Sequence, residues 1–534
     1  MKQKKITTVA KELGLNIDNI EPYGHYKAKV PLNQIKNDKI DNNHLILVSS
    51  MSPTPEGIGK TTLSIGLSDA LCSLGEKSVV AIREPSLGPI FGKKGGATGG
   101  GQSTVFPSED INLHFNGDFA AVEKANNLLS ALIDNYLRFQ EQTYQIDPKT
   151  VVWKRVMDMN DRSLRKIITG LGGQVGGVPM ESGFNITAAS EIMAILCLSK
   201  SLGDLKKRIG NIFVGWTYDK HPVFVRDLGF EEAVTVLLKE AIKPNLVQTC
   251  LGNPALIHGG PFANIATGTN SILATQLGLS YGKYVVTEAG FGAELGAEKF
   301  FNIISRNEGI SPSATVILFS IKSLEYHGDG DLKNGFSNLK RHYHNCKKFG
   351  IPIIAALNLW KADDKNKIKQ VAELCEKEGI LYTSCAPYTR GAKGVEELAK
   401  LVIRECEQKA KFHPSYELSL PLRDKINHIA KDFYGASNVK FTSKALFEMK
   451  EIEKLGLSDF PICMAKTPLS FSDNPQLKGC PTDFDFLVRD FEFSAGAEFI
   501  IPMAGDVMRM PAFGRSPAAL GISIDEQGNI SGIL

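Results

Sequence analysis

The stretch Thr54-Pro55-Glu56-Gly57-Ile58-Gly59-Lys60-Thr61 decides how this 534-residue chain folds. An apolar run at residues 45–49 precedes it, and the helical pattern KTTLSIGLSDALCSLG begins at Lys60. Glycines in such a loop let backbone N–H groups converge on phosphate oxygens, and a helix N-terminus adds partial positive charge. Lys60 would reach the β- and γ-phosphates of ATP, and the Thr61 hydroxyl would bind Mg²⁺. The sequence therefore predicts a P-loop at residues 54–61, with Lys60 in a catalytic role and Thr61 as a metal ligand.

The loop departs from the usual pattern at its first position. Thr54 stands where that pattern has glycine, although the segment GKTT is intact. The alternative interpretation is a glycine-rich turn between a strand and a helix, with a surface lysine. The strand before the loop and the helix after it favour the phosphate loop.

Short apolar runs rich in β-branched residues recur along the chain, with helical patterns between them. Runs of this kind belong to strands that are covered on both faces, and their alternation with helices indicates parallel strands. The sequence predicts an α/β fold, with a P-loop NTPase-like parallel sheet domain at 1–355 and smaller α/β domains at 356–445 and 446–534. The runs are residues 44–48, 78–82, 284–287, 314–319 and 351–357.

Other elements follow from the same patterns. Apolar residues at steps of three and four predict a helix over 121–136, and the N-terminal segment reads as an ordinary first helix. Short strands are expected at 484–488 and 499–502. Glycine is concentrated at 88–101, 170–177 and 259–268, which we interpret as functional loops rather than linkers because they lie within the α/β segments.

The composition excludes several classes of protein. The net charge of +3 is small for this length and gives no reason to expect a nucleic-acid or membrane partner. The nine cysteines form no CxxC pair, so they indicate neither a zinc site nor a disulfide framework. A signal peptide and a membrane span both need an apolar run that the sequence lacks. We therefore expect a soluble, cytoplasmic protein.

Six further segments carry a family resemblance over nearly the whole chain. Together with the loop they are similar, in order, to signatures of the formate–tetrahydrofolate ligase family. Because the likeness covers nearly all of the chain, it is more specific than any single motif. The segments are REPSLGP (83–89), EDINLHF (109–115), IKPNLVQT (242–249), IHGGPFANIA (257–266), VVTEAGFGAELGAEKF (285–300) and MAKTPLSFSD (464–473).

The resemblance implies a ligation in two steps. ATP would phosphorylate formate to formyl phosphate, and tetrahydrofolate would then displace phosphate to give 10-formyltetrahydrofolate, ADP and phosphate. Arg83, at the end of the second strand, could hold the small anion with its fork of donors, or it could form a structural ion pair. His258 could donate to the transferring phosphoryl group or handle a proton, or it could be a simple hydrogen-bonding residue.

The resemblance also implies where the folate binds. Trp360 in NLWKADD and Tyr388 in APYTRG occupy positions where the family uses aromatic rings to sandwich the pterin. Either ring could instead belong to the core. The family further implies a homotetramer and activation by a monovalent cation, with formate, ATP and tetrahydrofolate as small-molecule partners.

Five positions depart from the family pattern by losing ionisable residues. Neutral drift would explain these changes, and so would a divergent paralogue with reduced or redirected activity. Such a paralogue could be an acyl-phosphate-forming kinase, an NTPase or a nucleotide-binding regulatory protein. Lys60, Thr61, Arg83 and His258 are retained, which favours the ligase. The departures are Ile58, Ala120, Asn126, Asn185 and Thr267.

Overall fold

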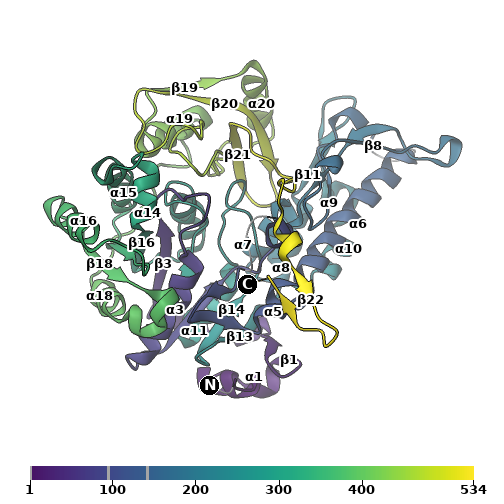
Figure 1. The fold of residues 1–534 in the computed structure, drawn as a ribbon. Coiled ribbons are helices and arrows are strands. Elements are labelled where there is room, and N and C mark those ends of the chain that lie inside the picture. Colours follow the sequence, from purple (N-terminus) through teal and green to yellow (C-terminus); the bar gives the residue numbers. More distant parts are fainter. Residues whose placement is uncertain (1–2, 93–96, 140–143, 534) are drawn as a thin grey trace.

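A large mixed sheet organises the chain in the computed structural model, which describes residues 3–92, 97–139 and 144–533 (Figure 1). Its strands run in the order β1-β2-β13-β14-β4-β15-β3-β16-β17-β18, and the β5–β6 hairpin joins it through β13. The seven strands from β14 to β18 in this order pair in parallel. The outer members are β1 (Glu21–Tyr23), β2 (Lys27–Lys29), β5 (Gly99–Gly100), β6 (Ser103–Phe106), β13 (Asn245–Thr249), β14 (Pro254–Ile257) and β18 (Tyr382–Cys385).

All five predicted apolar runs are strands at the centre of this sheet. Successive residues of a strand point to opposite faces, and nearly every residue of these strands is buried, so both faces are covered. The prediction of an α/β fold with parallel strands is confirmed. The strands are β3 (His44–Ser50), β4 (Ser78–Ile82), β15 (Tyr284–Glu288), β16 (Ala314–Phe319) and β17 (Ile353–Asn358).

Helices pack on the central strands and connect them. Helix α3 (Lys60–Ser73) follows β3 and packs against β15 and β4, and α11 (Ile272–Tyr281) also packs against β15 and β4. Helices α15 (Leu332–Lys347) and α18 (Glu396–Cys406) pack near the β16–β18 end. Because the connected strands are parallel, their carboxyl ends and the loops that follow lie along one edge of the sheet, where α/β proteins bind ligands.

The two helices predicted at 121–136 and at the N-terminus are also present. Helix α6 (Asp118–Arg138) contains the predicted span 121–136, and α1 (Ile6–Leu13) is the predicted first helix. Among the described residues, no helix is both long enough and apolar enough to cross a membrane.

A second, three-stranded sheet lies in the C-terminal part, at the top of Figure 1. Its strands are β19 (Asn438–Phe441), β20 (Asp485–Ser494) and β21 (Phe499–Ala504), with α20 (Ser443–Lys454) packed against β20. The two strands predicted at 484–488 and 499–502 are therefore confirmed. Strand β17 spans residue 355 and β18 continues the same large sheet, so the sheet extends beyond the boundary predicted at 355, while the three-domain division itself stays a prediction.

Candidate active site

The loop between β3 and α3 turns tightly at its glycines. Gly57 and Gly59 adopt φ of 85° and 87°, in the left-handed region that favours glycine. The Gly57 N–H donates to the Thr54 carbonyl over 3.0 Å, which closes a tight turn containing Pro55 and Glu56. Gly59 immediately precedes α3, so the loop delivers the chain to the N-terminus of a fourteen-residue helix.

Lys60 and Thr61 begin that helix and contact the end of β3 and of its neighbour β15. The Lys60 ammonium donates to the Phe291 carbonyl over 2.7 Å and to the Ser50 hydroxyl over 3.3 Å. The Thr61 hydroxyl donates to Glu288 Oε2 over 2.9 Å. Glu288 is the last residue of β15, the strand between β3 and β4. Glu288 is not among the residues predicted from the sequence, although its place at the carboxyl end of an apolar strand could have indicated it.

Glu288 also faces Arg83. The Arg83 Nη2 atom lies 3.7 Å from Glu288 Oε1, and the arginine side chain keeps 26% of its surface exposed. Arg83 Nη1 donates to the Pro261 carbonyl over 3.3 Å. One carboxylate therefore stands between the phosphate loop and the predicted anion-binding arginine.

Several buried polar atoms at positions 83–84 and in the segment 264–267 lack hydrogen-bond partners among the described residues. They are Arg83 Nε, Glu84 Oε2, Asn264 Oδ1 and Thr267 Oγ1. Burial raises the pKa of Glu84 well above its ordinary value. Because buried polar groups in proteins are nearly always paired, unpaired atoms of this kind indicate positions where a polar ligand could bind.

His258 lies one strand further along and is sealed from this space. Its ring is fully buried, with Nδ1 2.6 Å from the Ser271 hydroxyl and Nε2 2.6 Å from the Ala241 carbonyl. Burial lowers the pKa of His258 to about 4, so the ring is neutral at physiological pH. With both nitrogens engaged by the scaffold, the geometry favours the hydrogen-bonding alternative over proton transfer.

Trp360 and Tyr388 come together at the other end of the same edge. Trp360 follows β17 and Tyr388 lies in α17 (Pro387–Arg390), which follows β18. Their ring centroids are 5.5 Å apart with an interplanar angle of 39°, and the residues are 40% and 45% exposed. Neither ring belongs to the core, and both leave part of their aromatic surface accessible.

A glycine hairpin packs directly under Tyr388. The Gln102 N–H donates to the Tyr388 carbonyl over 3.0 Å, and a Cβ added at Gly101 would lie 2.1 Å from that carbonyl oxygen. Gly101 therefore permits a close approach that another residue would prevent. Part of the predicted glycine-rich segment, residues 93–96, lies outside the described residues.

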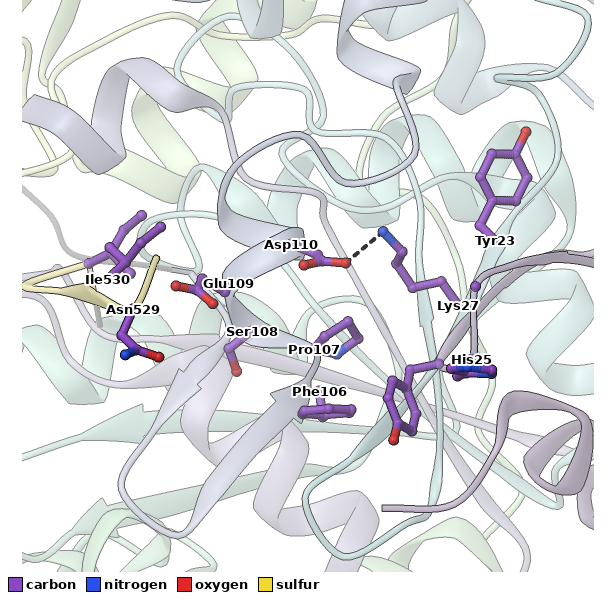
Figure 2. A pocket seen from close by; sticks show the side chains of 13 residues that line it. Tyr23, His25, Lys27, Phe106, Pro107, Ser108, Glu109, Asp110, Asn529 and Ile530 are labelled. Carbon is purple, nitrogen blue, oxygen red and sulfur yellow. Dashed lines mark ion pairs between the residues drawn. The ribbon is translucent and has the colours of Figure 1, made fainter. Parts of the chain in front are cut away.

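Two cavities differ in their relation to these residues. One of about 490 Å³ is lined by Phe291 and Asn264 together with residues of the segments 466–475 and 505–508, so it lies beside the group that holds Lys60. The other, of about 720 Å³, lies between the β1–β2 hairpin, the start of α5 (Ser108–Asn112) and the segment 529–533. Figure 2 shows Lys27 and Asp110 pointing toward each other there, paired at 2.7 Å. Among the described residues, none of the predicted site residues lines this larger cavity.

The five departures from the family pattern lie in different environments. Ile58 is a buried core residue whose carbonyl accepts from Asn358, while Ala120 is exposed on α6. Asn126 is buried and donates to the Lys154 carbonyl over 2.9 Å. Asn185 lies buried in β10 (Phe184–Asn185), and Thr267 has a buried hydroxyl without a hydrogen-bond partner among the described residues.

Comparison with known proteins bears on the whole chain. A sequence model described as formate–tetrahydrofolate ligase matches residues 1–534. The formate–tetrahydrofolate ligase of Limosilactobacillus fermentum is 49% identical, over 99% of this chain and 97% of its own length. Proteins of that name from Parabacteroides distasonis (99% of this chain, 98% of its own) and Campylobacter concisus (100% and 98%) are 49% and 50% identical. This chain belongs to the formate–tetrahydrofolate ligase family.

Proposed function

We propose that the chain ligates formate to tetrahydrofolate at the expense of ATP, through formyl phosphate. Family membership supports this function. The observation that carries it is the position of Glu288, which bonds Thr61 at 2.9 Å and faces Arg83 at 3.7 Å. A phosphate loop and an anion-binding arginine that share one carboxylate suit the transfer of a phosphoryl group to a small acid.

The strand–loop–helix unit from β3 to α3 supports a P-loop NTPase-like arrangement for binding ATP. Residues 54–61 would surround the phosphates with backbone N–H groups, and Lys60 would neutralise the charge that develops during transfer. Thr61 and Glu288 supply the hydroxyl and carboxylate oxygens that Mg²⁺ prefers. When bound, Mg²⁺ would offset the negative charge of the phosphate oxygens.

In the first step, a formate oxygen would attack the γ-phosphorus and the bond to ADP would break. Arg83 would orient the formate, since a guanidinium matches a carboxylate with two parallel donors. In the second step, a folate nitrogen would attack the formyl carbon, and the carbon–oxygen bond to phosphate would break. The products would be 10-formyltetrahydrofolate, phosphate and the proton lost from nitrogen.

Trp360 and Tyr388 would bind the pterin. Their exposed, tilted faces suit a flat heterocycle, and aromatic stacking fixes such a ring without charge. For His258 we propose a positioning role, because its two bonds tie the end of β14 to Ser271 and Ala241.

We also propose that the protein forms a homo-oligomer, which the family resemblance implies is a tetramer. The hairpin formed by β8 (Ile167–Thr169) and β9 (Met180–Ser182) projects to the right in Figure 1. Ile168, Leu171 and Val175 on it are 67%, 71% and 87% exposed, and exposed apolar groups of this kind favour an interface. Light scattering on the native chain and on a variant with serine at these three positions would test this.

Three smaller proposals complete the description. The nine cysteines are all free thiols, which suits the reducing cytoplasm. Activation by a monovalent cation is implied by the family and would be tested by comparing potassium with a bulky organic cation. The division into 1–355, 356–445 and 446–534 would be tested by limited proteolysis.

One assay tests the proposed function. The purified protein is given ATP, Mg²⁺, formate and tetrahydrofolate, while 10-formyltetrahydrofolate and phosphate are both followed. We expect the two products in equal amounts, each dependent on formate. Formate-dependent ADP release without formylated folate would instead support an acyl-phosphate-forming kinase. ATP binding without turnover would support a regulatory protein.

A further inference from the structure

We propose that a buried chain of side chains, Ser52–His342–Glu294–Lys466, positions the phosphate loop and the support of Lys60. The proposal rests on the proposed function for its ligand, ATP. All four residues are 0% exposed. Ser52 lies in the loop, Glu294 in the turn after β15, His342 on α15, and Lys466 in the segment before β20. Four distant parts of the sequence therefore meet behind the loop.

The hydrogen bonds at Ser52 fix the direction of each donor. The Ser52 N–H donates to Asn338 Oδ1 over 3.2 Å, and Asn338 Nδ2 donates back to Ser52 Oγ over 3.1 Å. Ser52 Oγ also lies 3.0 Å from His342 Nε2. Among the described residues, His342 Nε2 is the one acceptor available to the Ser52 hydroxyl proton, so the hydroxyl donates to that nitrogen. His342 must then carry its proton on Nδ1.

That Nδ1 atom faces Glu294. The distance from His342 Nδ1 to Glu294 Oε2 is 3.6 Å, and neither atom has a hydrogen-bond partner elsewhere in the described part of the chain. Glu294 Oε1 lies 3.3 Å from the Lys466 ammonium, so the carboxylate is paired. Burial lowers the pKa of His342 well below its ordinary value, which keeps the ring neutral.

The order of serine, histidine and carboxylate is that of a hydrolase triad, but its environment differs. In a hydrolase the serine is open to substrate. Here the Ser52 side chain is fully buried and its oxygen already bonds Asn338 and His342. These four residues therefore hold the loop in one conformation, and the Ser52 hydroxyl does not attack a substrate.

Glu294 also anchors the turn that supports Lys60. The Phe291 carbonyl, three residues before Glu294, accepts from Lys60, and the Ala293 N–H donates to the Ser50 carbonyl over 2.8 Å. Phe291 has φ of 58°, a left-handed backbone that a residue with a side chain adopts only when its surroundings impose it. The four buried residues therefore contact the loop directly at Ser52. Through Glu294 they also hold the turn whose Phe291 carbonyl accepts from Lys60.

Lys466 connects the four buried residues to the C-terminal sheet. Its ammonium also donates to the Ser470 carbonyl over 2.5 Å and to the Thr467 carbonyl over 3.0 Å. The preceding residue, Ala465, bridges to Met503 of β21. A change at Lys466 is therefore expected to reach the phosphate loop, although the two segments are distant in sequence.

Hydrogen exchange on the full chain without nucleotide tests the positioning directly. We expect the amides of residues 51–60 to exchange about tenfold faster in His342→Phe, Glu294→Gln and Lys466→Met. His342→Gln, which keeps a hydrogen-bonding group for Ser52, should restore much of the protection. His344→Phe is the matched control, because His344 is exposed on the same helix.

Two further readouts separate positioning from a loss of general stability. Nitrogen-15 NMR should find His342 in the Nδ1–H form, with its signal altered in Glu294→Gln. Titration with ATP should show affinity about tenfold weaker in His342→Phe but unchanged in His344→Phe. Loop exchange in His342→Phe equal to that of the control, or an Nε2–H ring, would overturn the proposal.

Uniformly faster exchange across the whole chain in every variant, including His342→Gln, would also overturn it. If the native chain does not bind ATP, the proposed function fails. The exchange and tautomer results would then still decide whether this chain of residues positions the loop.

Discussion

Two groups of residues lie at opposite ends of the sheet edge formed by the carboxyl ends of the parallel strands, and they differ in their exposure to solvent. At one end, Glu288 joins Thr61 and faces Arg83, and all three are partly or fully withdrawn from solvent. At the other end, Trp360 and Tyr388 are 40% and 45% exposed and contact each other. Stabilising charge during phosphoryl transfer requires polar groups already oriented by the scaffold, whereas binding a flat ring requires an accessible aromatic face.

The largest expected effect comes from Lys60. Lys60→Ala should lower kcat about 10³-fold, because the substitution removes the cation that we propose neutralises the transferring phosphoryl group. The measurement is steady-state formation of 10-formyltetrahydrofolate, with circular dichroism to confirm folding. Lys369→Ala, which removes a highly exposed lysine paired with Glu373 on α16 (Lys365–Lys377), is the matched control. Near-normal turnover in Lys60→Ala would place the phosphate site elsewhere.

The pH dependence of the free energy of unfolding tests whether His258 has a structural role. Its pKa is about 4 in the folded chain against an ordinary 6.5, so the unfolded chain binds the extra proton first as pH falls. This residue should therefore stabilise the fold above about pH 6.5 and lose about 2 kcal/mol of that contribution between about pH 7.5 and pH 5. Urea unfolding of the native chain and of His258→Gln should show this difference.

Turnover separates the two roles of His258. If it only supports the scaffold, folded His258→Gln should keep kcat within about threefold of the native value, whereas loss of a proton-transfer group costs roughly 10²-fold or more. A loss of that size in folded protein would return His258 to a catalytic role.

A substitution of Arg83 tests whether this residue binds formate. Arg83→Lys keeps the charge but removes the planar fork, so kcat/KM for formate should fall about 10²-fold. The formate dependence of the rate is measured at saturating ATP, and ATP affinity is measured separately. Arg390→Lys, at an exposed arginine beside Tyr388, should change neither quantity. Equal losses in formate and ATP dependence would argue against a formate-specific role.

Substitutions of Trp360 and Tyr388 should have smaller effects on the reaction than substitutions of Lys60 and Arg83. Trp360→Ala and Tyr388→Ala should each weaken folate binding by roughly 1 kcal/mol, about fivefold in KM, with kcat nearly unchanged. Trp360→Phe should recover most of the affinity, since it keeps an aromatic face. Tyr218→Ala, at an aromatic residue that is 57% exposed, serves as the control. A fall in kcat without a change in KM would indicate that these rings align the reacting nitrogen.

The smallest effect is expected from restoring a family residue. Thr267→His places a titratable ring where a buried hydroxyl has no partner, so kcat should rise by roughly twofold to fivefold. Asn126→His should give no gain, because Asn126 already bonds the Lys154 carbonyl. If neither variant gains activity, the departures reflect neutral drift.

The central strands and the loop could be predicted because their signals are local. An apolar run such as 314–319 identifies a buried strand wherever it lies, and the segment GKTT identifies the start of α3. The order of the strands could not be read in this way, since β15 lies between β4 and β3 although more than two hundred residues separate it from them in sequence. Glu288 and the Ser52–His342–Glu294–Lys466 chain stayed hidden for the same reason: only tertiary packing brings these residues together.

The strand order has a consequence for the reaction. Neighbouring strands lie about 4.8 Å apart, so β17 is roughly 10 Å and β18 roughly 14 Å from β3, whereas β4 lies roughly 10 Å away on the other side. The backbone spacing of the sheet therefore sets the separation between the loop at 54–61, Arg83 and the pair formed by Trp360 and Tyr388. In the proposed reaction, substitutions in the loops can change the affinity at each of these three positions, but the distance between the positions is a property of the sheet itself.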